Sequence, residues 1–463
     1  MEKNKIYFRI TLPHQLIIGK MKYILVFILL FSFITKESYA QQNTGRFDNF
    51  LTLEDIWKNI EKNNKNIKVE LLEIKRREQI IHSAIADYFP DISLNANYDR
   101  NTKMPVYENE LFSTPDYFPI GKYGYGVGYE LSLDLYDGGK KYRNTKLRKE
   151  EKNLVVHQCE ATKNNIKLIA AVTYYDLFRN LQFRDLVQQE ILADKLQLKT
   201  IENFYNNGVV LKSDLLRASV KLSDIELSLS EINNNIQLDI QQLNILMGRD
   251  ENNSIEINYH ELFSFADLNC SGYEELTSIA LKENFICKMA LDRLNISKLN
   301  IRQSKANVLP KIAFFSYYNI KYPQVFLYPY SSNQYGFGQF GIKISFPIDA
   351  FYKNSYKVTA NKLAYKQERI NRNIVEDKLS IKIREIYLQL QYSKESIETA
   401  NKNIVRVTET VRVLKNAYYN QQLTLTDLLD AETDLLDAKF KLMTSKINLQ
   451  IEYLKLREAM GVL

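Results

Sequence analysis

Four aspartates follow one another at helical spacing near the end of this 463-residue chain. Asp427, Asp430, Asp434 and Asp437 are separated by three, four and three residues, so one helix would carry them on one face. Carboxylates gathered on one face repel one another, attract cations and raise some of each other's pKa values. The spacing leaves two interpretations open, a surface that attracts cations or, for Asp434 and Asp437, a simply solvated helix face.

The first of these aspartates also has an ordinary structural explanation. Thr424 precedes Asp427 by three residues, an arrangement in which the threonine is a helix N-cap and the aspartate complements the helix dipole. Asp430 lies one turn further along, where capping does not account for it. For Asp427 both explanations stay open.

Other residues that could do chemistry are scattered. The four histidines are His14, His82, His157 and His260. They form no HExxH motif or ligand cluster, and the chain has no GxSxG motif or phosphate-binding loop. Its 62 basic and 55 acidic residues are mixed along helical segments, without the basic block of a nucleic-acid-binding surface. The sequence predicts no enzyme, no cofactor, no metal site and no nucleic-acid partner.

The N-terminal segment has the features of a secretory signal peptide. Lys22 precedes an apolar run at 23–34, and Ser38 and Ala40 occupy the −3 and −1 positions of a cleavage site. We therefore expect residues 1–40 to be removed, with the first twenty as an extended n-region or a false upstream start. No cysteine follows the cleavage site, so no lipid anchor is predicted there.

The chain repeats itself. The segment "DYFPDISLNANY" around Pro90 corresponds to "NVLPKIAFFSYY" around Pro310, and the endings "NILMG" and "REAMG" correspond as well. These matches predict an internal duplication, with repeats at 41–248 and 273–463 and a connector at 249–272. Each repeat has the same predicted order: a helical segment, a strand, a loop, a strand, and a long helical stretch with one interruption.

Alternation of apolar and polar residues predicts the strands. It is strict at 123–135 and recurs at 92–98. In the second repeat the alternation changes phase between Phe337 and Phe340, so we expect a β-bulge near Gly338. A soluble sandwich would also alternate, but large outward-facing residues and strands of this length fit an outer-membrane barrel. Because four strands cannot close a barrel in lipid, several chains must contribute, and two copies or three would serve.

Long helices are predicted where glycine and proline are absent, at 140–205 and over 348–460. After the breaks at "NNGVVLKSD" and "NQQLTLTD" we expect a second helix, at about 213–247 and 426–460. Leucine or isoleucine recurs there every seven residues, which predicts coiled-coil packing. Such helix pairs could line a conduit or form a solid rod.

Together these features resemble the TolC-like outer membrane efflux proteins over nearly all of the mature length. The motifs that carry the resemblance are the strand entry "FPDISLNANY", the twin "MG" endings, "LTLEDIWKNIEKNN" at 51–64, "LYDGGKK" at 135–141 and "YNNGVVLKSDLLRA" at 205–218. The resemblance implies a mixed α and β membrane protein. It implies a homotrimer with a twelve-stranded outer-membrane barrel, four strands from each chain, continued by a long periplasmic α-helical coiled-coil barrel.

The same resemblance implies a function and partners. The chain would be the passive exit duct of a tripartite efflux or type I secretion system, embedded in outer-membrane lipid. It would bind a periplasmic adaptor (membrane fusion) protein and work with an inner-membrane pump of the RND, ABC or MFS type. The alternative is a secreted or surface coiled-coil scaffold or adhesin, which explains the heptads but not strands inserted at equivalent places in two repeats.

Carried over position by position, the resemblance also implies residue roles. Asp427 and Asp430 fall on the acidic positions that ring the periplasmic entrance, and Asp214 and Tyr418 on positions that hold the closed state. Leu423 stands where the best-studied members have an arginine, so this chain lacks the arginine that forms the ionic lock in those members. The two helix turns are expected to dock the adaptor through Gly208, Val209, Val210, Leu211, Gln421, Gln422, Leu423 and Thr424. Since Arg217 stands where the second repeat has Asp430, the second turn is the better candidate to face a channel axis.

Overall fold

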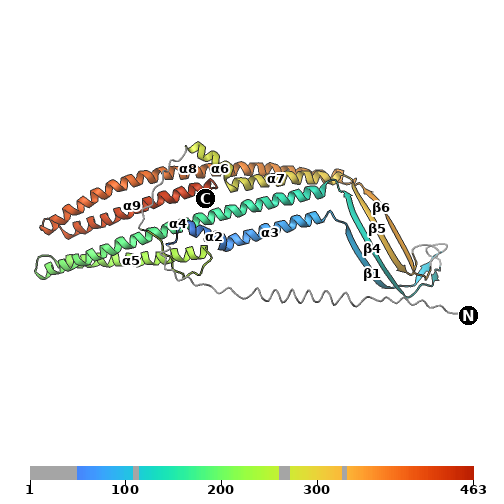
Figure 1. Ribbon diagram of the computed structural model, residues 1–463, viewed down its shortest axis with the longest axis horizontal. Helices are drawn as coiled ribbons and strands as arrows, with labels where there is room; N and C mark the ends of the chain where they lie inside the picture. The colour runs from blue at the N-terminus through green and yellow to red at the C-terminus, as the bar shows by residue number, and fades with distance from the viewer. Residues whose placement is uncertain (1–49, 108–113, 260–271, 326–330) are drawn as a thin grey trace, which may run out of the picture. The chain divides into compact units, whose positions relative to one another are not determined.

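The computed structural model describes residues 50–107, 114–259, 272–325 and 331–463 (Figure 1). The predicted signal peptide, 1–40, lies outside the described residues, as do Cys270 and part of the predicted connector.

Long helices occupy the stretches that lack glycine and proline. α4 (Lys140–Asn206) and α8 (Ala350–Tyr419) contain 67 and 70 residues, about 100 Å each at 1.5 Å per residue. Each turns back into a 35-residue helix, α5 (Lys212–Leu246) or α9 (Leu425–Ala459). The predicted ends of α4, α5 and α9 are confirmed to within a residue, and α4 packs along α5 as α8 packs along α9 (Figure 1).

A helical segment precedes the first strand of each repeat, as predicted. It consists of two helices in each half of the chain: α2 (Leu53–Asn63) and α3 (Lys65–Ala86), then α6 (Tyr273–Glu283) and α7 (Phe285–Lys305), which ends in the 3₁₀ turn η1 (Ala306–Val308). An asparagine separates each pair, Asn64 or Asn284, and its side chain caps the next helix by accepting bonds from two backbone N–H groups.

These asparagines also explain the "MG" endings. The Asn64 side-chain amide donates to the Leu246 carbonyl at the end of α5, 2.8 Å away. There Gly248 has a left-handed φ of +68°, and a Cβ on it would lie 2.8 Å from the Asn63 carbonyl oxygen. The same arrangement recurs at the end of α9. The Asn284 side-chain amide donates to the Ala459 carbonyl, and Gly461, which also has a left-handed φ, lies against the Glu283 carbonyl.

Four antiparallel strands form one sheet in the order β1-β4-β5-β6. They are β1 (Asp91–Arg100), β4 (Tyr123–Tyr136), β5 (Lys311–Tyr322) and β6 (Tyr335–Ser345). The predicted strands are confirmed, and β4 pairs with β5, which joins the two halves of the chain. Among the described residues, β1 and β6 are the edges of this sheet.

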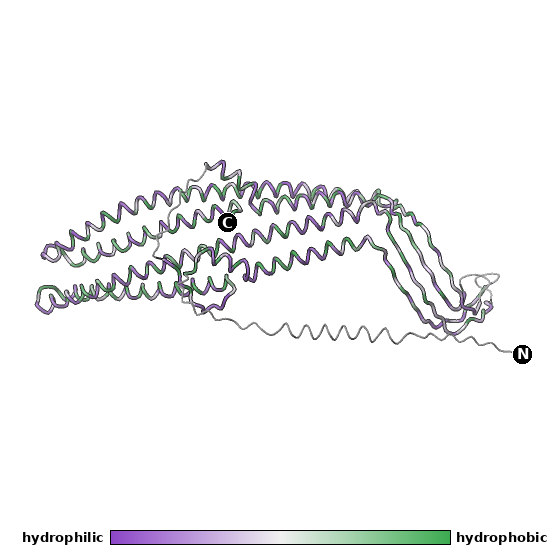
Figure 2. Tube along the Cα trace, in the orientation of Figure 1, coloured by the Kyte–Doolittle hydropathy of each residue, from purple (hydrophilic) through white to green (hydrophobic). Residues whose placement is uncertain are grey.

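The strand register separates an apolar face from a polar one. Leu94, Tyr129 and Tyr318 lie side by side on β1, β4 and β5, and the flanking row on the other face includes Asn95, Gly128 and Asn319. Figure 2 shows the corresponding alternation of hydropathy along the strands. One face of the sheet is therefore apolar and the other polar, as the alternation predicted.

The predicted bulge near Gly338 is wrong, because β5 and β6 pair without a shift in register. Gly336 and Gly338 lie on the apolar face and leave room for the Tyr318 ring, which a Cβ on Gly338 would approach to 2.7 Å. Phe337 instead lies on the polar face. The alternation of faces therefore continues through β6, with glycines at positions where large apolar residues were expected. The register irregularity lies instead in β4, at 134–136.

Two short strands were not predicted. β2 (Met104–Val106) and β3 (Asp116–Phe118) pair antiparallel within the loop predicted between the first two strands. A connection of this length can make its own hairpin, and no strong alternation marks strands of three residues.

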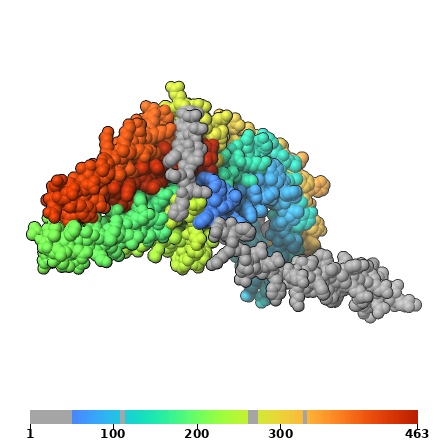
Figure 3. All heavy atoms as spheres, turned by 60° about the vertical axis from the view of Figure 1, so that its left-hand side comes forward, coloured from blue at the N-terminus to red at the C-terminus, as the bar shows by residue number. Residues whose placement is uncertain are grey.

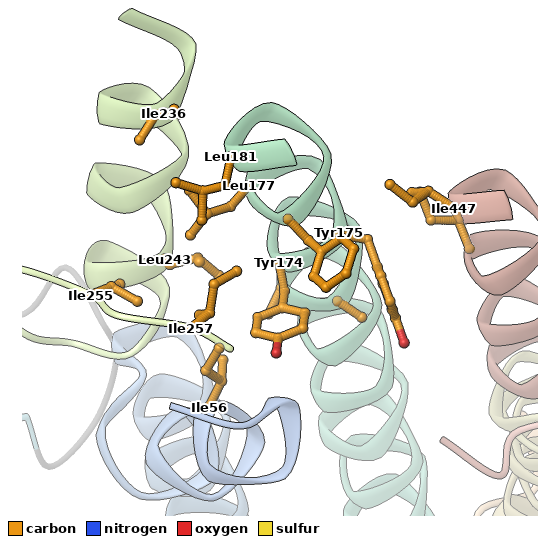
Figure 4. Close-up of a cluster of buried hydrophobic side chains, with 14 of the residues drawn as sticks. Ile56, Tyr174, Tyr175, Leu177, Leu181, Ile236, Leu243, Ile255, Ile257 and Ile447 are labelled. Atoms are coloured by element: carbon orange, nitrogen blue, oxygen red, sulfur yellow. The ribbon is translucent and has the colours of Figure 1, made fainter. Parts of the chain in front are cut away.

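The largest core cluster gathers where α2 meets the α4–α5 pair. Ile56 of α2, Tyr174 and Leu177 of α4, Leu243 of α5 and Ile447 of α9 belong to it (Figure 4). The predicted heptad positions are all buried or half-buried: Leu215, Leu222, Leu229, Ile236, Leu243, Leu428, Leu435, Leu442, Leu449 and Leu456. The period of seven thus marks the packed side of α5 and α9.

Apolar and polar residues alternate along the helices as well (Figure 2). Within the described ranges, we found no helix with a stretch both long enough and apolar enough to cross a bilayer.

Candidate functional site

The two turns between paired helices close with the same hydrogen bonds. At the end of α4 the Gly208 N–H donates to the Tyr205 carbonyl (2.9 Å) and the Val209 N–H to the Phe204 carbonyl (2.8 Å). This is a common helix-ending motif. At the end of α8 the Gln421 N–H donates to the Tyr418 carbonyl (2.8 Å), and the Gln422 N–H donates to the Ala417 carbonyl (2.9 Å).

The predicted docking residues lie in these turns and differ in exposure. Val209 and Leu211 are 48% and 72% exposed. Val210 and Leu423 are half-buried, and the remaining members of the predicted set are exposed: Gly208, Gln421, Gln422 and Thr424.

Gln421 should be a strained residue, and replacing it with glycine should stabilise the turn. Its φ is +60°, whereas glycine fills the matching position of the first turn with φ +73°. A side chain in this left-handed region costs about 1 kcal/mol, so Gln421→Gly should stabilise the protein by that amount in thermal or denaturant unfolding. The matched change Gly208→Ala should destabilise it, because a Cβ there meets nothing within 4 Å and only backbone strain is added. A stability loss in Gln421→Gly would contradict this account.

Asp427 has the capping geometry predicted for it. Thr424 is the N-cap of α9, and its hydroxyl oxygen accepts from the Asp427 N–H at 3.4 Å while the hydroxyl donates to the Asp427 carboxylate. The first turn lacks this device, since Leu211 is the N-cap of α5 and makes no side-chain bond there. Asp427 is thus held at the helix start, with its carboxylate exposed.

Asp430 lies one turn further along α9 and is exposed as well. Its side chain lines a groove between α5 and α9, together with Arg217, the residue at the corresponding position of the first repeat. The two neighbouring predicted carboxylates therefore have different surroundings.

Tyr418 is buried and lies within the electrostatic influence of Asp214. Tyr418 is 8% exposed, and its hydroxyl has no hydrogen-bond partner in the described part of the chain. Burial raises the pKa of Tyr418 above its usual value, and the Asp214 carboxylate adds to that shift. The tyrosine ring belongs to a small core that joins both hairpins near their turns, with Ile201, Ala218, Leu425 and Leu428.

Sequence reasoning missed a buried ionic cluster between the two hairpins. The Lys221 ammonium of α5 lies 2.9 Å from the Glu432 carboxylate of α9 and 3.6 Å from the Asp194 carboxylate of α4. Glu432 and Asp194 are 8% and 6% exposed. Burial raises the pKa of Asp194 to about 6, although Lys221 opposes this.

The only sequence signal for this cluster was its place beside the heptads. Lys221 and Glu432 lie three and four residues after Ala218 and Leu428, two small or apolar residues of the packed stripe. That places them at the margin of the packed side, but which hairpin residues face each other depends on tertiary packing.

Histidine and cysteine serve packing here. The His157 ring of α4 lies 2.6 Å from the Asp292 carboxylate of α7 and links two helices. Cys159 and Cys287 are buried, which raises the pKa of both thiols. Across the residues that the structure covers, no group of three or more His, Cys, Asp or Glu side chains is placed to hold a metal ion.

The fold has close likenesses among solved structures. The outer membrane protein VceC from Vibrio cholerae matches with a TM-score of 0.74 and 18% identity, over 88% of this chain and 96% of VceC. The outer membrane channel CmeC from Campylobacter jejuni matches with a TM-score of 0.75 and 15% identity, over 91% and 90% of the two chains. At these identities the likeness shows a shared fold.

A comparison with curated protein sequences found no match. The family described as "Outer membrane efflux protein" does match, at residues 57–249 and again at 276–462. Since these two segments cover most of the chain, the protein belongs to the outer membrane efflux protein family.

Proposed function

We propose that three copies of this chain form the exit duct of a tripartite efflux or type I secretion system. Each copy contributes four strands to a twelve-stranded barrel in the outer membrane, and its long helices form a coiled-coil barrel in the periplasm. Family membership supports export as the function. The observation that carries the assembly is a sheet with one apolar face and two edges that pair on one side only.

The edges argue against a chain that works alone. In lipid an unpaired strand edge leaves backbone N–H and C=O groups without partners, so barrels in membranes are closed. In the part of the chain that the structure describes, β1 and β6 are such edges, and β6 of one copy would pair with β1 of the next. The exposed apolar face would meet lipid, with side chains such as Leu94 (80% exposed) and Phe340 (81% exposed).

The helices also leave apolar surface uncovered. Along α8 the large side chains Tyr356, Leu363, Ile370 and Ile381 are all exposed in the isolated chain. Patches of this kind mark contacts with other proteins. Neighbouring copies would cover them, which favours a ring of chains over a solid rod or a free scaffold.

The domain organisation belongs to the same proposal. Residues 1–40 are the signal peptide, 41–248 and 273–463 are the two repeats of an ancient duplication, and 249–272 connect them. The identical hydrogen bonds in the two helix turns and in the two "MG" endings support this assignment. The acidic pair occurs only in the second repeat.

The assembly can be tested on the protein in membranes. Outer-membrane fractions should yield a trimer that resists SDS at room temperature and dissociates on heating, and the purified trimer should conduct ions across a planar bilayer. A monomer in the soluble secreted fraction would overturn the proposal and favour the adhesin alternative.

Adaptor docking is expected at the two turns, because each turn interrupts a helical stretch that is otherwise continuous, from Lys140 to Leu246 or from Ala350 to Ala459. A photo-cross-linking residue at Val209 or Leu423 should capture the periplasmic adaptor in cells. The matched control is Tyr117 in the β3 strand, which is 60% exposed and belongs to neither turn. Capture from Tyr117 alone would contradict docking at the turns.

A further inference from the structure

A groove runs between the two hairpins close to their turns. α5 and α9 form its walls, α4 contributes to its floor, and its volume is about 580 Å³. Figure 3 shows the α4–α5 hairpin in green beside the α8–α9 hairpin in red and orange. The volume lies within the range of pockets that bind drug-sized molecules.

The groove is lined by apolar side chains from three helices. Val220 of α5, Leu429, Leu436 and Phe440 of α9, and Val187 of α4 all contribute. Val220 is 60% exposed although it lies among these neighbours, so the isolated chain leaves apolar surface open there. Covering such a surface with an apolar molecule lowers the free energy of the system.

The charges around the groove are unbalanced. Five carboxylates line it, against two basic side chains, Arg217 and Lys221. Glu432 holds Lys221 at 2.9 Å, so this pair is internally neutralised. What remains is a single arginine against Glu190, Asp224, Asp430 and Asp437. The groove therefore combines apolar walls with an excess of negative charge.

We propose that this groove binds amphipathic organic cations, with the apolar part against Val220 and Phe440 and the positive charge near Asp437. The inference rests on the proposed duct function and names a class of cargo for it. An organic anion would meet the excess carboxylates, and a small hydrated cation would gain nothing from the apolar walls. Because Asp430 lies in the same groove, a bound cation would be held beside the predicted entrance.

The test uses the trimer in lipid nanodiscs and the fluorescent cation rhodamine 6G, followed by anisotropy against empty nanodiscs. Asp437→Asn should weaken binding by about three- to tenfold, since it removes one partly screened charge. Asp434→Asn is the matched control: Asp434 lies on the same helix and is exposed but does not line the groove, so binding should not change.

A second pair of variants tests the apolar walls. Val220→Trp fills the groove and should weaken binding by about tenfold or more. Leu227→Trp adds the same side chain to α5 outside the groove, at a residue that is 70% exposed, and should leave binding unchanged. Both sites are exposed in the isolated chain, and a trimer on the gel shows that each variant has assembled.

Two results would overturn the inference. The first is that wild type, Asp437→Asn and Val220→Trp bind rhodamine 6G with the same affinity. The second is that the wild type binds the anionic dye fluorescein as tightly as it binds rhodamine 6G. Either result in trimers that still conduct ions would leave the duct function intact, whereas a protein that forms no conducting trimer would count against the proposed function itself.

Discussion

Replacing Lys221 with methionine should lower the free energy of unfolding by about 3–5 kcal/mol, the usual cost of removing one partner from a buried ion pair. The Lys221 ammonium lies between Glu432 at 2.9 Å and Asp194 at 3.6 Å, which come from different hairpins. Methionine keeps the length and apolar stem of the side chain but leaves two buried carboxylates facing each other. The loss therefore measures how strongly this lysine joins α4, α5 and α9.

The matched control is an exposed ion pair between α4 and α5, two of the three helices that the Lys221 cluster joins. Lys195 of α4 lies 2.9 Å from Glu226 of α5, with side chains 55% and 48% exposed. Lys195→Met should cost no more than about 1 kcal/mol, because water screens an exposed pair. Thermal unfolding followed by circular dichroism compares the two variants, and equal losses would show that burial does not set the strength of the Lys221 cluster.

The pH dependence of the Lys221→Met defect gives a second readout. Burial raises the pKa of Asp194 from its usual 3.8 to about 6. A raised carboxyl pKa means that the native state binds the proton more tightly, so this stability contribution is present below pH 4 and lost as the pH rises through 6. Without the lysine, ionised Asp194 has no cation beside it. The defect should therefore grow as the pH rises from 5 to 8, because Asp194 then ionises without a neighbouring cation.

Replacing Asp430 with asparagine should reduce the cation selectivity of the reconstituted trimer, by about threefold or more in permeability ratio. In the proposed threefold assembly this residue would add three carboxylates near the predicted entrance, and among the described residues no capping bond holds it. Asp427 differs because Thr424 binds its carboxylate and its N–H. Asp427→Asn should therefore change selectivity less.

Reversal potentials in a salt gradient measure this selectivity in single-channel recordings. The double variant Asp427→Asn, Asp430→Asn should show the largest change, and Asp434→Asn the smallest, since it lies further along the exposed face of α9. If the double variant selects ions as the wild type does, these two carboxylates do not form the charged entrance.

Local sequence patterns were enough to predict the long elements. The absence of glycine and proline fixed α4, α8 and their partners to within a residue where ends were predicted, and strict alternation located β1 and β4. These signals are local, because each helix or strand repeats its pattern many times along the chain. Thr424 and Asp427 were predictable for the same reason, since a capping box lies within four residues.

Predictions failed where the deciding contact comes from elsewhere in the chain. Gly338 was taken for a bulge because nothing local shows that the Tyr318 ring of β5 fills the space beside it. The break at Asn64 was not foreseen, because the Asn64 side chain binds the carbonyl of Leu246, which is 182 residues away in the sequence.

The chemistry of the helix turns divides in the same way. The sequence by itself determined that Asp427 and Asp430 stand on one helix face and that the first repeat has Arg217 instead. Only the tertiary structure brought Lys221 of α5 to Glu432 of α9, and Arg217 into one groove with Asp430. Spacing within a helix fixes which side chains share a face, but the register between two hairpins follows from the packing of their cores.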